Sequence, residues 1–341
     1  MREPSDRPVS IRDVARAAGV STATVSNVYN DKSEMTPATR ERVLAVGARL
    51  GYRPSAIGRA LRSGRSRVLG IVVGFGDSVV WQETYMPYYR DVIAGAALEA
   101  VGHGYSIAAA PAAADGRIDT NLPLDGVILV DPVPPDPIVE YCARQGIAVV
   151  TDGGYPRPEE TASPLRSVRV NLQDGLPALF EGMRPAGGAG LRPALFVGPR
   201  LDSYSSDTIA VYDAWCSAQS VSPLVWALRP GEDPVAGAAR LFTEEDGLFD
   251  AVHSLNETYS NALLAVARDR AVRIPDELQL SVVGRAGASG ADPRVNYLDV
   301  DPVHTGAVCV RTLIALLEAG DPDAVDDVIL DARVLPGGRS R

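Results

Sequence analysis

The most informative stretch of the chain reads SIRDVARAAGVSTATVSNVYN and covers residues 10–30. Ser10 and Asp13 can cap a helix at its start, and apolar residues follow them at the spacing of one helical face. Gly19 then breaks the helical pattern, which resumes over residues 22–30. Two short helices joined by a turn that contains glycine predict a helix-turn-helix unit.

The outward side of the second helix is small and polar, which is typical of a helix that enters the major groove of DNA. A third helix is expected from Pro37 to Leu50, with Thr36 as its cap and Gly51 at its end. We expect three side chains of the second helix to contact base edges: Thr22, Ala23 and Asn27. We expect the surrounding hydroxyl and amide side chains on phosphates: Ser10, Ser21, Thr24, Ser26, Asn30, Thr36 and Thr39.

The charge of the chain is divided unevenly along its length. Residues 1–67 hold 13 Arg and Lys against 6 Asp and Glu, a net charge of +7, whereas the rest hold 20 against 37, a net charge of −17. A basic head on an acidic body suits a unit that meets phosphates while the body is repelled by DNA. The alternative is a basic surface that binds nothing.

Two further motifs follow in order, TRERV at residues 39–43 and LGYRPSA at residues 50–56. Together with the first stretch they resemble the signature of the lactose-repressor (LacI) family of transcription regulators. The resemblance implies a homodimer that binds a palindromic operator, most often as a repressor. Members of this family usually carry Arg at the position of Asn27. Arg reads guanine whereas Asn prefers the edge of adenine, so an altered base is expected in the half-site.

Residues 53–67 resemble the hinge helix and linker of the same family. A helix of this length is not stable alone in water, so we expect it to form only with DNA and a partner chain. The resemblance implies that Leu61 inserts into the minor groove and kinks the duplex. Gly58 stands where the family usually has Ala, and this glycine should make the hinge helix harder to order. The residues expected at the minor groove are Ser55, Ala56, Gly58, Arg59 and Leu61.

Beyond residue 67, short apolar segments alternate with amphipathic helices, as in parallel sheets with helices on both faces. We expect strands at residues 68–73, 106–110, 126–130, 148–151, 194–198, 224–228, 251–254 and 281–284. We expect helices at residues 88–103, 174–182, 208–219, 234–242, 259–270 and 303–319.

The resemblance implies an α/β core like that of periplasmic binding proteins, with two doubly wound parallel-sheet halves and a ligand between them. The expected domains are an all-α helix-turn-helix head over 1–52, a hinge over 53–67 and an effector-binding and dimerisation core over 68–341. The chain should cross between the halves near Arg166, Asp301 and Val328, so that the first half comprises 68–166 and 302–327 and the second 167–301 and 328–341. No heptad repeat follows the core, which favours dimers over tetramers.

Three positions at which the family usually holds its effector have changed. Thr208 replaces an Arg, Ala286 replaces an Asp, and Asn256-Glu257 replaces Asn-Asp, so the usual bidentate contacts to sugar hydroxyls or purine edges are missing. The effector could be a carbohydrate or a derivative, another small molecule, or none if the core has lost effector binding. Its identity and its role as inducer or corepressor stay open.

The candidates for the effector cleft follow predicted strands or lie in an expected loop over residues 74–86. Trp81, Tyr85 and Tyr89 are also spaced four apart, which fits packing into a core equally well. The candidate residues are Trp81, Gln82, Tyr85, Asp131, Asp152, Tyr204, Thr208, Asn256, Glu257 and Arg285.

An enzyme is the main alternative class. Gly74-Phe75-Gly76 follows the first strand like a dinucleotide loop, but Val79 stands where a third Gly or Ala is needed. The three histidines and the acidic segment 321–327 fit structural or solvated roles, so we expect no catalytic site, cofactor or metal. The three scattered cysteines predict no disulfide framework, and the polar start and the lack of an apolar span predict a cytoplasmic protein rather than a secreted solute receptor.

Overall fold

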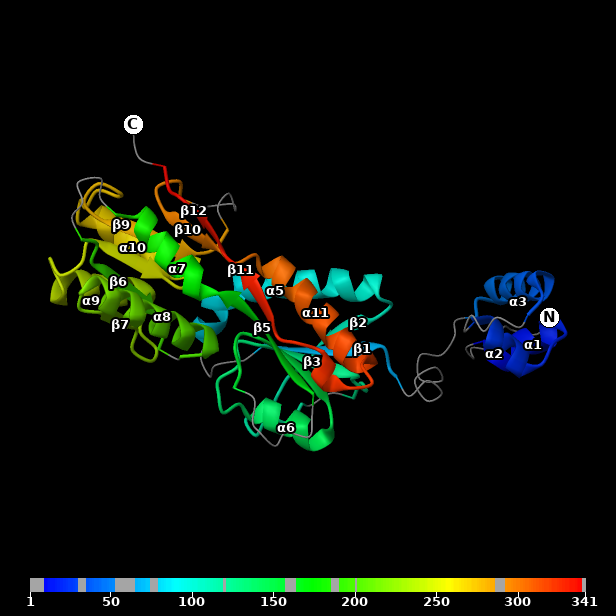
Figure 1. Cartoon of the computed structure of the whole chain (residues 1–341). Coiled ribbons are helices and arrows are strands. Elements are labelled where there is room, and N and C mark those ends of the chain that lie inside the picture. The colour runs from blue at the N-terminus through cyan, green and yellow to red at the C-terminus, as the bar shows by residue number, and fades with distance from the viewer. Residues whose placement is uncertain are drawn as a thin grey trace. The chain divides into compact units, whose positions relative to one another are not determined.

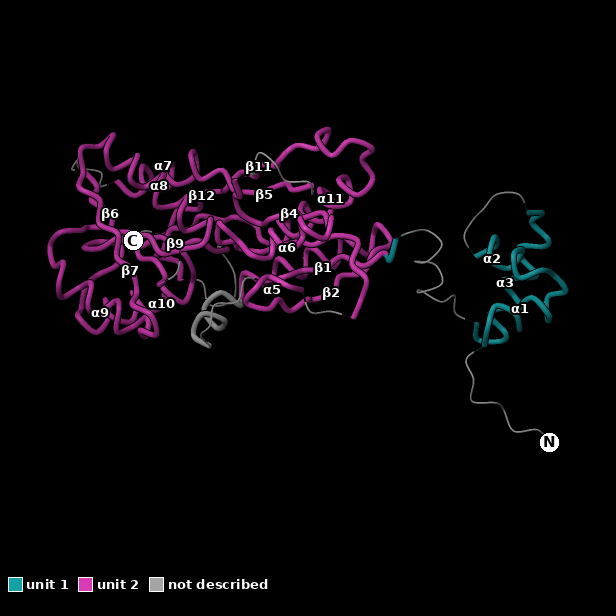
Figure 2. Tube along the Cα trace, turned by 90° about the horizontal axis from the view of Figure 1, so that it is seen from below, with its two compact units in different colours: residues 1–66 teal, residues 67–341 magenta. Residues whose placement is uncertain are grey.

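The computed structural model describes residues 9–29, 35–52, 65–73, 79–118, 121–156, 164–184, 190–199, 201–285 and 292–338, and it leaves the side chains of 79–86 undescribed. The chain forms two compact units, residues 1–66 and residues 67–341, which Figure 2 shows in different colours.

The first unit contains α1 (Ile11–Ala18), α2 (Thr22–Tyr29) and α3 (Pro37–Leu50). The Asp13 carboxylate accepts hydrogen bonds from the backbone N–H and the hydroxyl of Ser10, at 2.9 and 2.6 Å, and so fixes the start of α1. Gly19 ends α1 in the left-handed conformation, with φ of 65°, which glycine adopts without steric strain. The apolar faces of the three helices meet in one small core that includes Val14, Val25, Val28 and Val43.

The second unit contains two six-stranded sheets, and Figure 1 shows helices packed against them. The first has the order β11-β5-β4-β3-β1-β2 and is parallel throughout. Its strands are β1 (Val68–Val73), β2 (Ser106–Ala109), β3 (Gly126–Val130), β4 (Ala148–Asp152), β5 (Leu165–Asn171) and β11 (Val328–Asp331). Its helices are α5 (Val79–Gly102), α6 (Pro137–Gln145) and α11 (Pro302–Glu318), and the short 3₁₀ helix η1 (Pro322–Ala324) follows α11.

The second sheet has the order β12-β10-β9-β8-β6-β7, and only the β10–β12 pair is antiparallel among its described pairs. Its strands are β6 (Pro193–Val197), β7 (Leu224–Ala227), β8 (Ala251–Ser254), β9 (Gln279–Val283), β10 (Asn296–Asp299) and β12 (Arg333–Leu335). Its helices are α7 (Leu172–Gly182), α8 (Ser203–Gln219), α9 (Pro234–Glu244) and α10 (Glu257–Asp269). The predicted α/β architecture of two doubly wound halves is confirmed.

The chain crosses between the halves three times, and two crossings differ from the prediction. Arg166 lies inside β5, which pairs with β4, so the first crossing comes where β5 gives way to α7 at Leu172. Val328 begins β11, which pairs with β5, so the last crossing comes at Ala332. Both strands mix polar and apolar residues, and for this reason the apolar-run criterion did not identify them.

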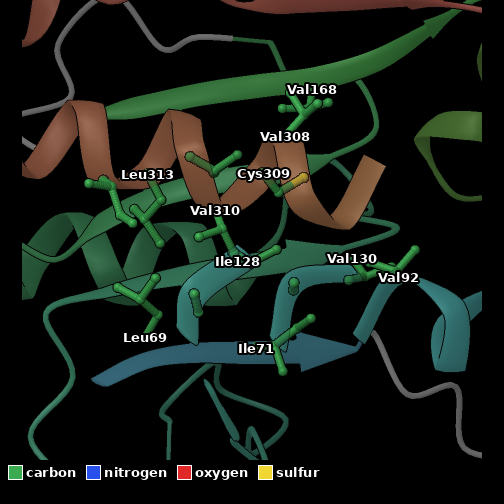
Figure 3. Close-up of a cluster of buried hydrophobic side chains, with 14 of the residues drawn as sticks. Leu69, Ile71, Val92, Ile128, Val130, Val168, Val308, Cys309, Val310 and Leu313 are labelled. Carbon is green, nitrogen blue, oxygen red and sulfur yellow. The ribbon is translucent and has the colours of Figure 1, made fainter. Parts of the chain in front are cut away.

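Helices α5 and α11 approach each other closely in the first half. A side chain at Gly95 of α5 would run into the backbone of Val303, and one at Gly306 of α11 would run into the backbone of Val92. Around this contact, Val92 and residues of α11 pack onto strands β1 and β3, as Figure 3 shows. Residues of α5 and α11 together bury apolar side chains of the first sheet.

The prediction for the start of α5 was wrong. The sequence predicts a loop up to residue 86 and a helix from residue 88. In the structure α5 already begins at Val79, and Pro87 lies inside it. The side chains of Trp81, Gln82 and Tyr85 are not described, so their expected place in the cleft is not tested.

Candidate functional site

The exposed face of α2 carries the residues predicted to read bases. Thr22, Ala23 and Asn27 are exposed, whereas Val25 and Val28 on the opposite face are buried at 0% and 2% exposure. The helical period thus places the polar residues on the exposed face of α2. Burial of the apolar residues on the opposite face holds the helix in this orientation. The result is a narrow surface of short side chains that a major groove can accept.

Several residues predicted to contact phosphates begin helices in the structure. The Ser21 hydroxyl accepts a hydrogen bond from the Thr24 N–H at 3.0 Å, and the Thr36 hydroxyl accepts from the Thr39 N–H at 3.4 Å. Ser10 is the N-cap of α1. Helix N-termini favour negative groups, so three such ends in one basic unit suit contacts to phosphates. Ser26 is partly buried, and Asn30 and the hinge residues Ser55, Ala56, Gly58, Arg59 and Leu61 lie outside the described residues.

A second candidate site lies between the two halves of the core. A cavity of about 370 Å³ is lined by residues that follow β3, β8, β9 and β10, by the start of α8 and by the part of α5 around Tyr88. These segments lie mostly at the carboxyl ends of parallel strands, where doubly wound folds bind their ligands. The volume falls within the range of small-molecule pockets.

The first half contributes buried carboxylates and a phenol. Asp131 and Asp152 are only 8% and 4% exposed, and the Asp131 N–H donates to the Asp152 carbonyl at 3.1 Å. The Tyr88 hydroxyl donates to the Asp152 carboxylate at 2.9 Å. Burial, reinforced by the nearby Asp202 and Asp152, raises the pKa of Asp131 well above its usual value. Burial raises the pKa of Asp152 to about 7, against the opposing effect of the Tyr88 hydrogen bond.

The second half contributes Asp202, Tyr204 and Asn256. Asp202 caps α8 by accepting from the Ser205 N–H at 2.7 Å, and Asn256 caps α10 by accepting from the Tyr259 N–H at 2.9 Å. The Nδ2 of Asn256 and the hydroxyl of Tyr204 are buried atoms that have no hydrogen-bond partner among the described residues. Buried polar groups are normally satisfied, so these two atoms are suited to receive a ligand.

Charged residues meet at the mouth of the cavity. Arg285, after β9, lies 4.0 Å from Asp91 of α5, so this ion pair joins the two halves. Burial raises the pKa of Glu257 above its usual value, and the charge of Asp91 adds to the effect. The mouth of the cavity therefore combines two acidic residues, Asp91 and Glu257, with two basic residues, Arg90 and Arg285.

Five of the predicted cleft residues line the cavity: Asp131, Tyr204, Asn256, Glu257 and Arg285. Two do not. Asp152 lies behind Tyr88, and Thr208 is fully buried with its hydroxyl donated to the Tyr204 carbonyl at 2.8 Å, a bond within α8. Sequence reasoning missed Tyr88, Asp91 and Asp202. The N-cap position of Asp202 was a usable signal, but the place of Tyr88 depends on how α5 packs.

Comparisons with known proteins agree with this architecture. Residues 10–55 match the model of the bacterial regulatory proteins of the lacI family. The chain is similar to members of this family. It is 26% identical to catabolite control protein A of Staphylococcus xylosus over 96% of this chain and 97% of that protein. It is 30% identical to the HTH-type transcriptional regulator MalR of Streptococcus pneumoniae over 40% of this chain and 43% of that protein.

Solved structures show the same fold along nearly the whole chain. The lac repressor dimer bound to operator and the anti-inducer ONPF has a TM-score of 0.78 at 19% identity, and the match covers 96% of this chain and 98% of that chain. The complex of the transcriptional regulator CelR with cellobiose has a TM-score of 0.64 at 20% identity, with 97% and 100% covered. This protein is a DNA-binding regulator of transcription. Among the described residues, no helix is long and apolar enough to cross a membrane.

Proposed function

We propose that this protein is a repressor that binds a palindromic operator as a homodimer, with α2 of each chain in a major groove and the hinge helices in the minor groove between them. The observation that carries the proposal is the exposed polar face of α2, bounded by capped helix starts in a unit of net positive charge. One such helix covers only a few base pairs, so two copies are needed to specify an operator. The protein would act on the nucleoid, in the cytoplasm.

The core then serves as the sensor. A small molecule that binds between the halves changes how far they close, and through residues 53–67 it changes the spacing of the two heads. The cavity and its buried unpartnered polar atoms favour a retained effector site over a core that has lost effector binding. The proposal therefore includes both repression of transcription and its control by a small molecule.

The test is selection of bound duplexes from a random DNA pool, followed by measurement of affinity against salt concentration. We expect a palindromic site and a steep fall in affinity with salt, because each neutralised phosphate releases counterions. Thr22→Glu should abolish binding by placing a negative charge on the groove-facing surface. Ala45→Glu adds the same charge at an exposed position of α3 and serves as the control. Enrichment of no site by the protein, alone or with metabolite pools, would reject the proposal.

A further inference from the structure

The inner end of the cavity is acidic, whereas its bases lie at the mouth. Asp131 and Asp202, 8% and 2% exposed, line the cavity, and Asp152 lies behind Tyr88. Among the described residues of the lining, the basic ones are Arg90 and Arg285, whose side chains are 71% and 53% exposed and lie 3.5 and 4.0 Å from Asp91. The positive charges of the lining are therefore already paired near solvent.

The buried acids of the first half have no basic neighbour within ion-pair distance. Among the described residues, no Arg, Lys or His nitrogen lies within 4.0 Å of the carboxylate of Asp131 or Asp152. The titratable groups that face them are the other acids, the phenols of Tyr88, Tyr89 and Tyr204, and the Cys309 thiol. None of these groups supplies a positive charge. Buried carboxylates ionise readily only beside a cation, so a cationic ligand would stabilise the ionised form of Asp131.

The other groups of the inner cavity suit the same ligand. Tyr88 lines the cavity and meets Tyr89 edge to face, with ring centroids 6.1 Å apart. Aromatic faces attract cations, and more strongly where water is excluded. The unpartnered Tyr204 hydroxyl and Asn256 Nδ2 can bind the polar remainder of the molecule. A neutral sugar would bring no positive charge to Asp131, and the side chain of Thr208 is buried away from the cavity.

We propose that the effector is a protonated amine, such as an amino sugar or another small polyhydroxylated amine, whose ammonium group lies between Asp131 and Asp202. The inference rests on the proposed function, because it names the chemical class of the molecule that the core senses. The cavity of about 370 Å³ limits the effector to a small molecule.

Proton release distinguishes this ligand from a neutral one. Burial raises the pKa of Asp152 to about 7 and the pKa of Asp131 well above its usual value, so both carboxyl groups keep their protons to a higher pH than exposed ones do. An ammonium group favours their ionised form, so its binding displaces protons and becomes tighter as the pH rises through 7. A neutral alcohol of the same shape has no such effect on the carboxylates.

The experiment is titration calorimetry on the full chain with two matched sets of probes: D-glucosamine against D-glucose and N-acetyl-D-glucosamine, and 1,4-diaminobutane against 1,4-butanediol. We expect at least one amine to bind at least tenfold more tightly than its neutral partners. Its apparent heat should depend on the ionisation heat of the buffer at pH 7, which reports proton release.

Asp131→Asn and Asp202→Asn should each weaken binding of the amine at least tenfold, and both can fold because Asn tolerates the left-handed backbone of Asp131 and can cap α8. Asp233→Asn makes the same change at the exposed cap of α9 and should bind like the parent. The inference is overturned if neutral probes bind as tightly as amines, if no amine binds, or if the two variants bind like the parent. Operator binding on the same samples tests the proposed function separately.

Discussion

The contact between α5 and α11 makes a quantitative prediction about the core. A Cβ added to Gly95 would lie 2.7 Å from the carbonyl carbon and 2.9 Å from the Cα of Val303, where ordinary contact begins at 3.4 Å. The two helices would have to separate by at least about 0.7 Å. Since the obstacle is backbone, no rotamer change can relieve it. Gly102, at the exposed end of the same helix, has nothing within 4 Å of its added Cβ.

Gly95→Ala should therefore lower the free energy of unfolding of the core by roughly 2–3 kcal/mol, in the upper part of the range for overpacked interiors. Gly102→Ala should leave it unchanged or raise it by up to about 1 kcal/mol, because alanine favours helix more than glycine does. The measurement is urea unfolding followed by circular dichroism, with midpoint and slope fitted for the transition of the core. Equal stability of the two variants would refute the close approach of the helices.

Three further predictions concern the head, the hinge and the cavity. Gly58→Ala should tighten operator binding several-fold by favouring the hinge helix by up to about 1 kcal/mol; unchanged or weaker affinity with an intact fold contradicts it. Asn27→Arg should shift one selected base of each half-site toward guanine, and an unchanged base preference would reject its role as a base reader. Because the pKa of Asp152 is raised to about 7, the folded state binds more protons than the unfolded state above pH 4, so this group makes stability fall as the pH rises through 7. Asp152→Asn, which keeps an acceptor for Tyr88, should reduce this loss between pH 6.5 and 8, and parallel pH profiles of variant and parent would count against the raised pKa. His253, whose pKa is lowered to about 3 by burial, acts in the opposite direction but mainly below this window.

The fold was predictable where one local pattern dominates. Strands β1 and β3 have the predicted bounds because each is a run of apolar residues and glycine between turns, and β8 also has its predicted bounds. Strands β5 and β11 were not predicted, since they lie toward one edge of the sheet, and polar residues such as Arg169 and Asp331 are exposed on them. Their membership of the first sheet depends on pairing between segments more than 150 residues apart, which no local window contains.

The site was predictable in part for a related reason. Asp131 directly follows β3, and Arg285 comes two residues after β9. Both residues line the cavity because the carboxyl ends of parallel strands meet at one edge of a sheet. Thr208 was selected because it replaces a family residue, but its short hydroxyl bonds within α8 and does not reach the cavity. Tyr88 comes from the middle of α5, and only the packing of that helix between the halves shows that it faces Asp152.

The return of α11 and β11 to the first half affects how the chain is made. The first sheet and its covering helix stay incomplete until residues 302–331 leave the ribosome, whereas α1 to α3 have their whole core within the first 52 residues. During synthesis the head can therefore fold long before the half of the core to which it is joined. A nascent chain released early would carry a folded head that lacks both the sensor and the complete core expected to hold two heads together.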